Sequence, residues 1–106
     1  MISIDEFGKV DLRVAEILEV NDHPNADRLY VLKIKVGEEE KSLVAGIKGH
    51  YTKEELIGKK IVVIVNLEPA VLRGVKSEGM LLAASNKDEV VLVTVDKDIE
   101  SGAKLG

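Results

Sequence analysis

Leu29-Tyr-Val-Leu-Lys-Ile-Lys-Val-Gly37 is the stretch that decides the fold. Its apolar side chains recur at every second position, at Tyr30, Leu32, Ile34 and Val36, and Lys33 and Lys35 occupy the other face. Alternation with period two predicts a strand that turns one face to a core and the other to solvent. Gly37 opens a tight acidic turn, Gly37-Glu-Glu-Glu40, which leads into another apolar segment, Ser42–Ile47.

Most of the remaining chain also has the pattern of short strands. Val10–Val14 alternates, and Ala15–Ile17 continues in a shifted phase that could mark a β-bulge. Ile61–Val65 is apolar on both faces, which predicts burial on both, and Met80–Ala84 and Val90–Val95 complete the set. The exception is Thr52–Glu55, whose capping-box spacing before Leu56 predicts one short helix that ends at Gly58.

This order of elements predicts an all-β fold. Five or six short strands with a single brief helix between the third and fourth are typical of an OB-fold, a five-stranded, partly open barrel, here with a C-terminal β extension. The 106 residues allow one domain, covering 1–106. OB-folds bind ligands on the outer face of strands two and three, where Lys33 and Lys35 are expected.

Composition excludes several classes of protein. The chain has no cysteine, so it has no disulfide, thiol nucleophile or cysteine-ligated zinc. The absence of an apolar run of about 18 residues, and of a signal-peptide pattern at the N-terminus, predicts a cytoplasmic protein without a membrane partner. The net charge is −4, but residues 28–76 carry ten basic and six acidic groups, a net of +4. A local basic patch is therefore compatible with an acidic chain.

Pro69–Ala84 is the most distinctive loop of the chain. Arg73 and Lys76 are cationic, Gly74 and Gly79 permit sharp turns, Ser77 adds a hydroxyl and Met80 opens an apolar strand. Such a loop suits a polyanion with exposed bases. The alternative is an ordinary basic hairpin loop on the surface of the domain.

No catalytic constellation is visible, and we expect no enzyme activity, cofactor or metal. Ser77 lacks the first glycine of a nucleophile elbow, and the two histidines, His23 and His50, have no neighbouring ligands. They are interpreted as turn or surface residues. Gly46-Ile-Lys-Gly49 matches the Gly-x-x-Gly loop of KH domains, but a strand precedes it where a helix is required.

Three segments in order resemble the tRNA-binding domain family: His23–Tyr30, Leu43–Ile47 and Asn66–Met80. That family includes free-standing tRNA-binding proteins and the C-terminal domain or beta subunit of methionyl-tRNA synthetase. The resemblance covers Ile4 to Gly106. It implies an OB-fold, often a homodimer, that grips folded tRNA by its shape.

The resemblance also implies contact residues for tRNA. Matching positions are Asn25, Arg28, Lys33, Arg73, Ser77 and Met80, and we add Lys35 and Lys76, with Lys41 and Lys48, from their charge. Local roles remain open: Asn25 and Asp27 could cap the turn after Pro24, Lys33 could be an ordinary solvated lysine, and Met80 could belong to the core. Many members carry serine where this chain has Ala45, so a hydroxyl that could contact RNA is missing.

We therefore expect a non-catalytic module that supplies tRNA affinity in trans to the catalytic subunit of methionyl-tRNA synthetase. A shallow basic groove of Lys33, Lys35, Arg73 and Lys76 would neutralise phosphates and make binding salt-sensitive. A homodimer could form through Ile61–Val65 and Val90–Leu105. Two alternatives remain: a chaperone-like member of the same fold family that binds extended peptides, and an assembly module that docks on a synthetase without binding RNA.

Overall fold

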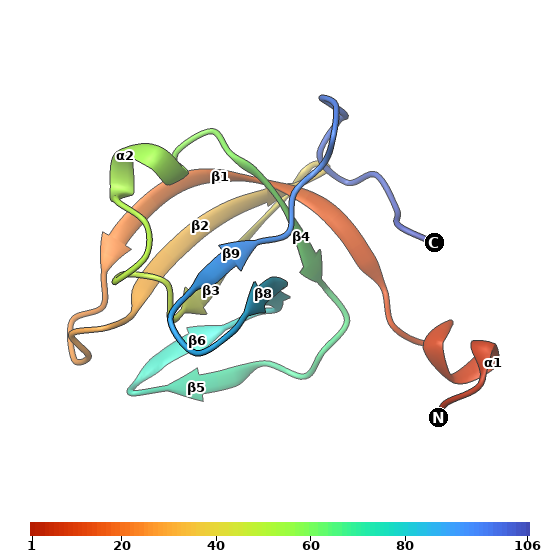
Figure 1. Ribbon diagram of the computed structural model, residues 1–106, viewed down its shortest axis with the longest axis horizontal. Coiled ribbons are helices and arrows are strands. Elements are labelled where there is room, and N and C mark those ends of the chain that lie inside the picture. The colour runs from red at the N-terminus through yellow and green to blue at the C-terminus, as the bar shows by residue number, and fades with distance from the viewer.

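The computed structural model describes all of residues 1–106 and contains two one-turn helices and nine strands (Figure 1). The elements in chain order are α1 (Ile4–Phe7), β1 (Leu12–Asp22), β2 (Tyr30–Val36), β3 (Glu39–Ala45), α2 (Lys53–Leu56), β4 (Lys60–Ile64), β5 (Ala70–Leu72), β6 (Val75–Ser77), β7 (Met80–Leu81), β8 (Ala83–Ser85) and β9 (Val90–Leu92). Each of the two helices is a single turn of four residues, so neither could span a membrane.

A five-stranded antiparallel sheet in the order β3-β2-β1-β4-β7 curls into a half-barrel (Figure 1). The long strand β1 joins its two halves, because Leu12–Glu16 pair with β4 and Glu16–Asp22 pair with β2. Leu18 is an extra residue in the β1–β2 ladder, and this bulge helps β1 to bend. The predicted all-β, OB-like barrel is confirmed.

The predicted bulge lies further along β1 than the shift in pattern suggested. Val14 and Ala15 are both buried because they face opposite sides of the sheet, and each side is covered. Ala15 belongs to the main core, whereas Val14 pairs with Val62 outside it. The C-terminal segment pairs with β1 here: Val14 N donates to Ala103 O at 2.9 Å, and Gly102 N donates to Val14 O at 2.7 Å.

This arrangement changes one expectation about self-association. Strand β4 is buried on both faces as predicted, with Ile61, Val62 and Val63 each at most 1 % exposed within a single chain. A dimer contact through Ile61–Val65 is therefore wrong for the central part of that strand, since its side chains are already covered. The C-terminal part keeps exposed apolar side chains at Val91 and Val93.

The main core fills the barrel with thirteen side chains, all apolar apart from the hydroxyl of Tyr30. The predicted helix is confirmed as α2: Thr52 and Glu55 form the capping box, and Leu56 is fully buried. The sequence reading missed α1, although Ser3 and Glu6 form the same capping box and gave the same signal.

Candidate nucleic-acid interface

The loop His23–Leu29 follows β1, and a backbone hydrogen bond between its first and last residues closes it. His23 N donates to Leu29 O at 3.1 Å. The His23 imidazole is 6 % exposed, and its Nδ1 accepts a hydrogen bond from Asn25 N at 2.9 Å. Because Nδ1 acts as an acceptor, the proton of the neutral ring lies on Nε2, which donates to Leu72 O at 2.8 Å. His23 is therefore a buried structural group: the expected turn role is confirmed by its bond to Asn25 N, whereas a surface role is wrong.

The tip of the β5–β6 hairpin meets this loop. Arg73 and Gly74 form a two-residue turn, and both have positive φ, 53° and 89°. The left-handed conformation costs a non-glycine residue about 1–2 kcal/mol, so Arg73 must be held by its surroundings. Asn25 Nδ2 donates to Arg73 O at 3.0 Å, and Arg73 Nη2 donates to Asn25 O at 3.2 Å.

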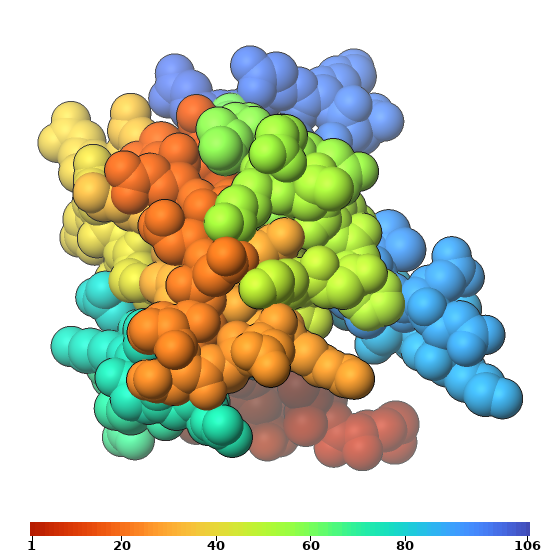
Figure 2. All heavy atoms as spheres, turned by 90° about the vertical axis from the view of Figure 1, so that its left-hand side faces the viewer, coloured from red at the N-terminus to blue at the C-terminus, as the bar shows by residue number.

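We call the four residues that join these segments, His23, Asn25, Leu72 and Arg73, the latch. It links parts of the chain about 48 residues apart and fixes the Arg73 turn beside the loop that carries Arg28. Figure 2 shows this end of the barrel: the orange 21–30 segment lies between the cyan β5–β6 hairpin and the lime residues near 50–57. Asn25 thus has a defined structural task beyond capping its own turn.

The predicted site residue Ser77 points inward. It is 4 % exposed, and its Oγ accepts from Val44 N at 3.0 Å while donating to Gly79 O at 3.1 Å. Glu78 N donates to Ser42 O at 2.8 Å, so this segment closes the barrel against β3. With its hydroxyl engaged on both sides, Ser77 stabilises the barrel and has no exposed face for RNA. Since Lys76 points outward, the period of two could have placed Ser77 inside.

Ala45 also lies in the core, at 6 % exposure. A serine hydroxyl at this position would face the interior of the barrel. The expectation that the chain loses an RNA contact here does not fit the structure.

The outer face of β2 is less basic than expected. Lys33 Nζ lies 3.1 Å from Glu40 Oε1, and Lys33 is the cross-strand partner of Glu19. The hydrogen bond and charge of Glu40, followed by the charge of Glu19, raise the pKa of Lys33 above its ordinary value. The shallow groove beside it, about 330 Å³, contains two lysines and three glutamates. Its lining residues are Glu19, Asn21, Val31, Lys33, Glu40, Lys41, Ser42 and Glu78.

Lys35 does not share a groove with the Arg73 turn. It lies opposite Glu16 and Glu40 in the sheet and lines a hollow near Gly37 together with Glu38 and other acidic residues. The expected groove of Lys33, Lys35, Arg73 and Lys76 is therefore wrong as one continuous basic surface. The strand alternation placed both lysines outward correctly, but it carried no information about the carboxylates on the neighbouring strands.

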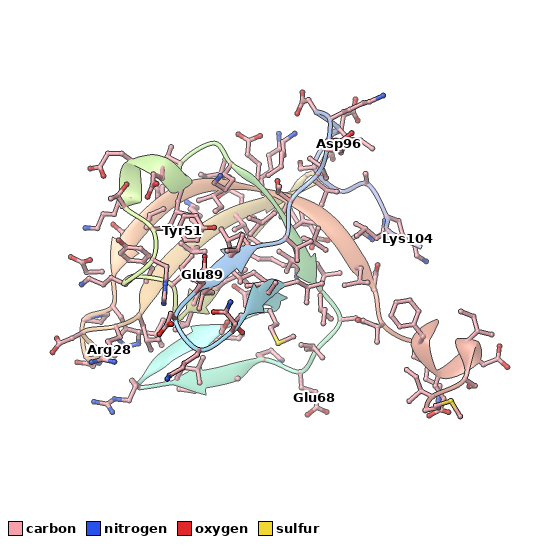
Figure 3. All side chains as sticks on the ribbon, viewed as in Figure 1. Arg28, Tyr51, Glu68, Glu89, Asp96 and Lys104 are labelled. Atoms are coloured by element: carbon pink, nitrogen blue, oxygen red, sulfur yellow. The ribbon has the colours of Figure 1, made fainter.

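The remaining predicted contacts are accessible. Arg28, Lys76 and Met80 are exposed, and none of their side chains makes a hydrogen bond or ion pair within the chain. Met80 is 48 % exposed and pairs with Ile64 at the edge of the sheet, so it is not a core residue. Arg28 lies at the same end of the barrel as the β5–β6 turn (Figure 3). Arg28, Arg73 and Lys76 therefore give this end its cations.

Comparison with known proteins agrees with this geometry. The family model described as "Putative tRNA binding domain" matches residues 12–104. Methionine–tRNA ligases of Thermococcus kodakarensis and Caldanaerobacter subterraneus are 57 % and 55 % identical over 104 residues, 98 % of this chain. The matched region spans only 14 % and 16 % of those two proteins.

Two solved structures with the same fold are described differently from each other. A methionyl-tRNA synthetase-related protein from Pyrococcus horikoshii has a TM-score of 0.92 at 34 % identity and covers 100 % of this chain and 98 % of its own. The chaperone CsaA from Picrophilus torridus has a TM-score of 0.93 at 39 % identity, with both chains covered completely. The family match, the sequence relatives and the fold together show that this chain belongs to the tRNA-binding domain family.

Proposed function

We propose that this domain binds folded tRNA, carries no catalysis itself, and supplies tRNA affinity in trans to a methionyl-tRNA synthetase in the cytoplasm. The observation that supports this best is the latched end of the barrel. There, Arg28, Arg73 and Lys76 are exposed without intramolecular partners except for the backbone contact of Arg73. The latch fixes the backbone segments that carry these cations, which suits the phosphates of a folded RNA, where position matters more than base identity.

The aromatic residues support recognition of shape over base stacking. Tyr30 is buried, and its hydroxyl donates to Tyr51 O at 2.8 Å. The Tyr51 hydroxyl accepts from Leu92 N at 3.1 Å, and Lys59 Nζ lies 6.0 Å from the ring centroid. Phe7 belongs to α1, away from the latch (Figure 1). No aromatic side chain is therefore free to act as a stacking platform beside the latch.

The test is a fluorescence-anisotropy titration of folded tRNA, with unstructured RNA of equal length as competitor, at several salt concentrations. Binding should be selective for tRNA, and the logarithm of the affinity should fall linearly with the logarithm of salt concentration. The double variant Arg73→Glu/Lys76→Glu should lose most of the affinity. The matched control Lys87→Glu/Lys97→Glu has the same change of net charge at exposed, unpaired lysines elsewhere. Equal losses of affinity in both variants would show that nonspecific electrostatic attraction, and not this site, accounts for tRNA binding.

A peptide-binding function is the second candidate. It is favoured by the similarity to the chaperone CsaA and by exposed apolar side chains on and beside the β5–β6 hairpin. These include Leu67, Val71, Leu72 and Met80. Binding of an unfolded peptide there should be insensitive to salt and should be unchanged by Arg73→Glu/Lys76→Glu.

The third candidate is a docking module, which predicts binding to a synthetase without affinity for tRNA.

We also propose that the domain is a homodimer in which α1 packs against a second copy of the chain. This helix has no buried residue, although Ile4 and Phe7 are apolar and are 82 % and 42 % exposed. One helical turn is not stable alone, so it requires a packing partner. Because α1 and the latch lie at opposite ends of the barrel (Figure 1), such a dimer leaves both RNA-binding ends free and raises avidity.

Sedimentation at micromolar concentration tests the dimer. The wild-type chain should sediment as a dimer, and Phe7→Asp should shift it to monomer while leaving the barrel folded by circular dichroism. A wild-type monomer at this concentration would contradict the proposal.

A further inference from the structure

A second cationic feature lies on the other side of the His23–Leu29 loop from the latch. It is a cleft of about 330 Å³ between this loop and the turn that follows β3. We call it the 28–48 cleft. Its six lining residues include no hydrophobic one: Asp27, Arg28, Gly46, Lys48, Gly49 and His50.

The charges around the 28–48 cleft favour an anion. Arg28 has no ion-pair partner, and Asp27 is the only carboxylate among the lining residues. Lys48 Nζ lies 3.0 Å from Asp22 Oδ1 at the rim, but Lys53 Nζ holds the other oxygen of the same carboxylate at 3.2 Å. Lys48 can therefore turn toward a ligand while Asp22 keeps a cationic partner.

The backbone of the 46–49 turn adds hydrogen-bond donors. The amide groups of Gly46, Lys48 and Gly49 donate to no atom of the chain, whereas His50 N donates to Ile47 O at 3.0 Å. Gly46 and Gly49 have no side chain to cover this backbone, and a Cβ at Gly49 would meet no atom within 4 Å. Free amides beside cationic side chains are the usual components of a phosphate-binding site.

We infer that the 28–48 cleft is a second subsite of the interface, and that it receives a phosphodiester of the RNA backbone on Arg28, Lys48 and the free amides of the 46–49 turn. The inference rests on the proposed tRNA-binding function. In this proposal the Gly-x-x-Gly segment Gly46–Gly49 contacts a phosphate although the chain does not have a KH fold. The His23–Leu29 loop then lies between the β5–β6 hairpin on one side and the segment that follows β3 on the other (Figure 2).

The test compares Arg28→Ala/Lys48→Ala with the matched control Lys87→Ala/Lys97→Ala in the tRNA titration across salt. Loss of one phosphate contact should lower the magnitude of the salt slope by about 0.7–0.9. Affinity near 0.1 M salt should fall roughly tenfold, whereas the control should change less than about twofold. The charge-preserving variant Arg28→Lys/Lys48→Arg should recover most of the slope, and thermal melts should show that all variants are folded.

The outcomes separate the two proposals. If wild-type protein does not bind tRNA, the proposed function fails. If wild-type protein binds tRNA but Arg28→Ala/Lys48→Ala keeps its slope and affinity, the cleft is not a subsite and the proposed function stands. A slope that falls equally in the control variant would also overturn the cleft, because the effect would then come from net charge alone.

Discussion

The His23 imidazole is the buried centre of the latch, and its replacement by alanine gives a prediction of defined size. Two hydrogen bonds are lost, to Asn25 N and to Leu72 O, each worth about 1 kcal/mol. Removing a side chain that is 6 % exposed also loses about 1 kcal/mol of buried ring contact. We therefore expect His23→Ala to lower the free energy of unfolding by about 3 kcal/mol. For a domain of this size, that corresponds to a fall in Tm of about 10–20 °C.

Two conservative variants divide this effect between the two ring nitrogens. In His23→Asn, the side-chain oxygen can replace Nδ1 as the acceptor for Asn25 N but cannot reach Leu72. In His23→Gln, the longer side chain can donate to Leu72 O in place of Nε2. Each variant should recover about 1 kcal/mol relative to His23→Ala. Urea unfolding followed by circular dichroism at fixed protein concentration measures all three.

The latch interpretation also requires coupling to Asn25, because both residues join the same two segments. The free-energy losses of His23→Ala and Asn25→Ala should add to more than the loss of the double variant, by at least about 0.5 kcal/mol. A loss below about 1 kcal/mol for His23→Ala would refute the reasoning. The reasoning would also be refuted if the free-energy losses of His23→Ala and Asn25→Ala were additive and if His23→Asn and His23→Gln were no more stable than His23→Ala.

Two further predictions concern the C-terminal segment and α2. Gly102→Ala should destabilise the fold by about 2 kcal/mol or more, because Gly102 has φ 93° and its Cβ would lie 2.8 Å from Gly37 Cα. Urea unfolding should show this, with Gly49→Ala, which has open space, nearly unchanged; similar losses would contradict it. The Thr52 backbone N–H and, second, the Thr52 hydroxyl lower the pKa of Glu55 below its ordinary value of 4.5. The ionised Glu55 carboxylate therefore stabilises the fold above pH 4.5, and this stabilisation disappears as pH falls through the lowered pKa. Glu55→Gln keeps the capping-box spacing but lacks the carboxylate charge, so its melting temperature should lie below that of wild type at pH 7, and the two should converge as pH falls from about 5 to 3; parallel curves would count against this.

The sequence alone determined the strand pattern of the barrel and the position of α2. The alternation in β2 and the apolar run in β4 can be recognised from local periodicity and composition alone, because these signals do not depend on how the other elements are arranged. The Thr52–Glu55 capping box is also local, since it satisfies the amides of its own turn. The same signal at Ser3 was present and was missed. The three motifs were sufficient to indicate the family, which the comparisons confirm.

Only the tertiary structure decided which polar groups remain free to contact a ligand. Lys33 and Lys35 face outward as expected, but the carboxylates that partly neutralise them come from neighbouring strands. Ser77 and Ala45 lie in matching motifs and still point into the barrel. The latch and the 28–48 cleft each combine side chains from segments far apart in the chain. Such pairings depend on sheet register and on loop positions in three dimensions, because burial and partnership are properties of neighbours in space that a linear pattern does not contain.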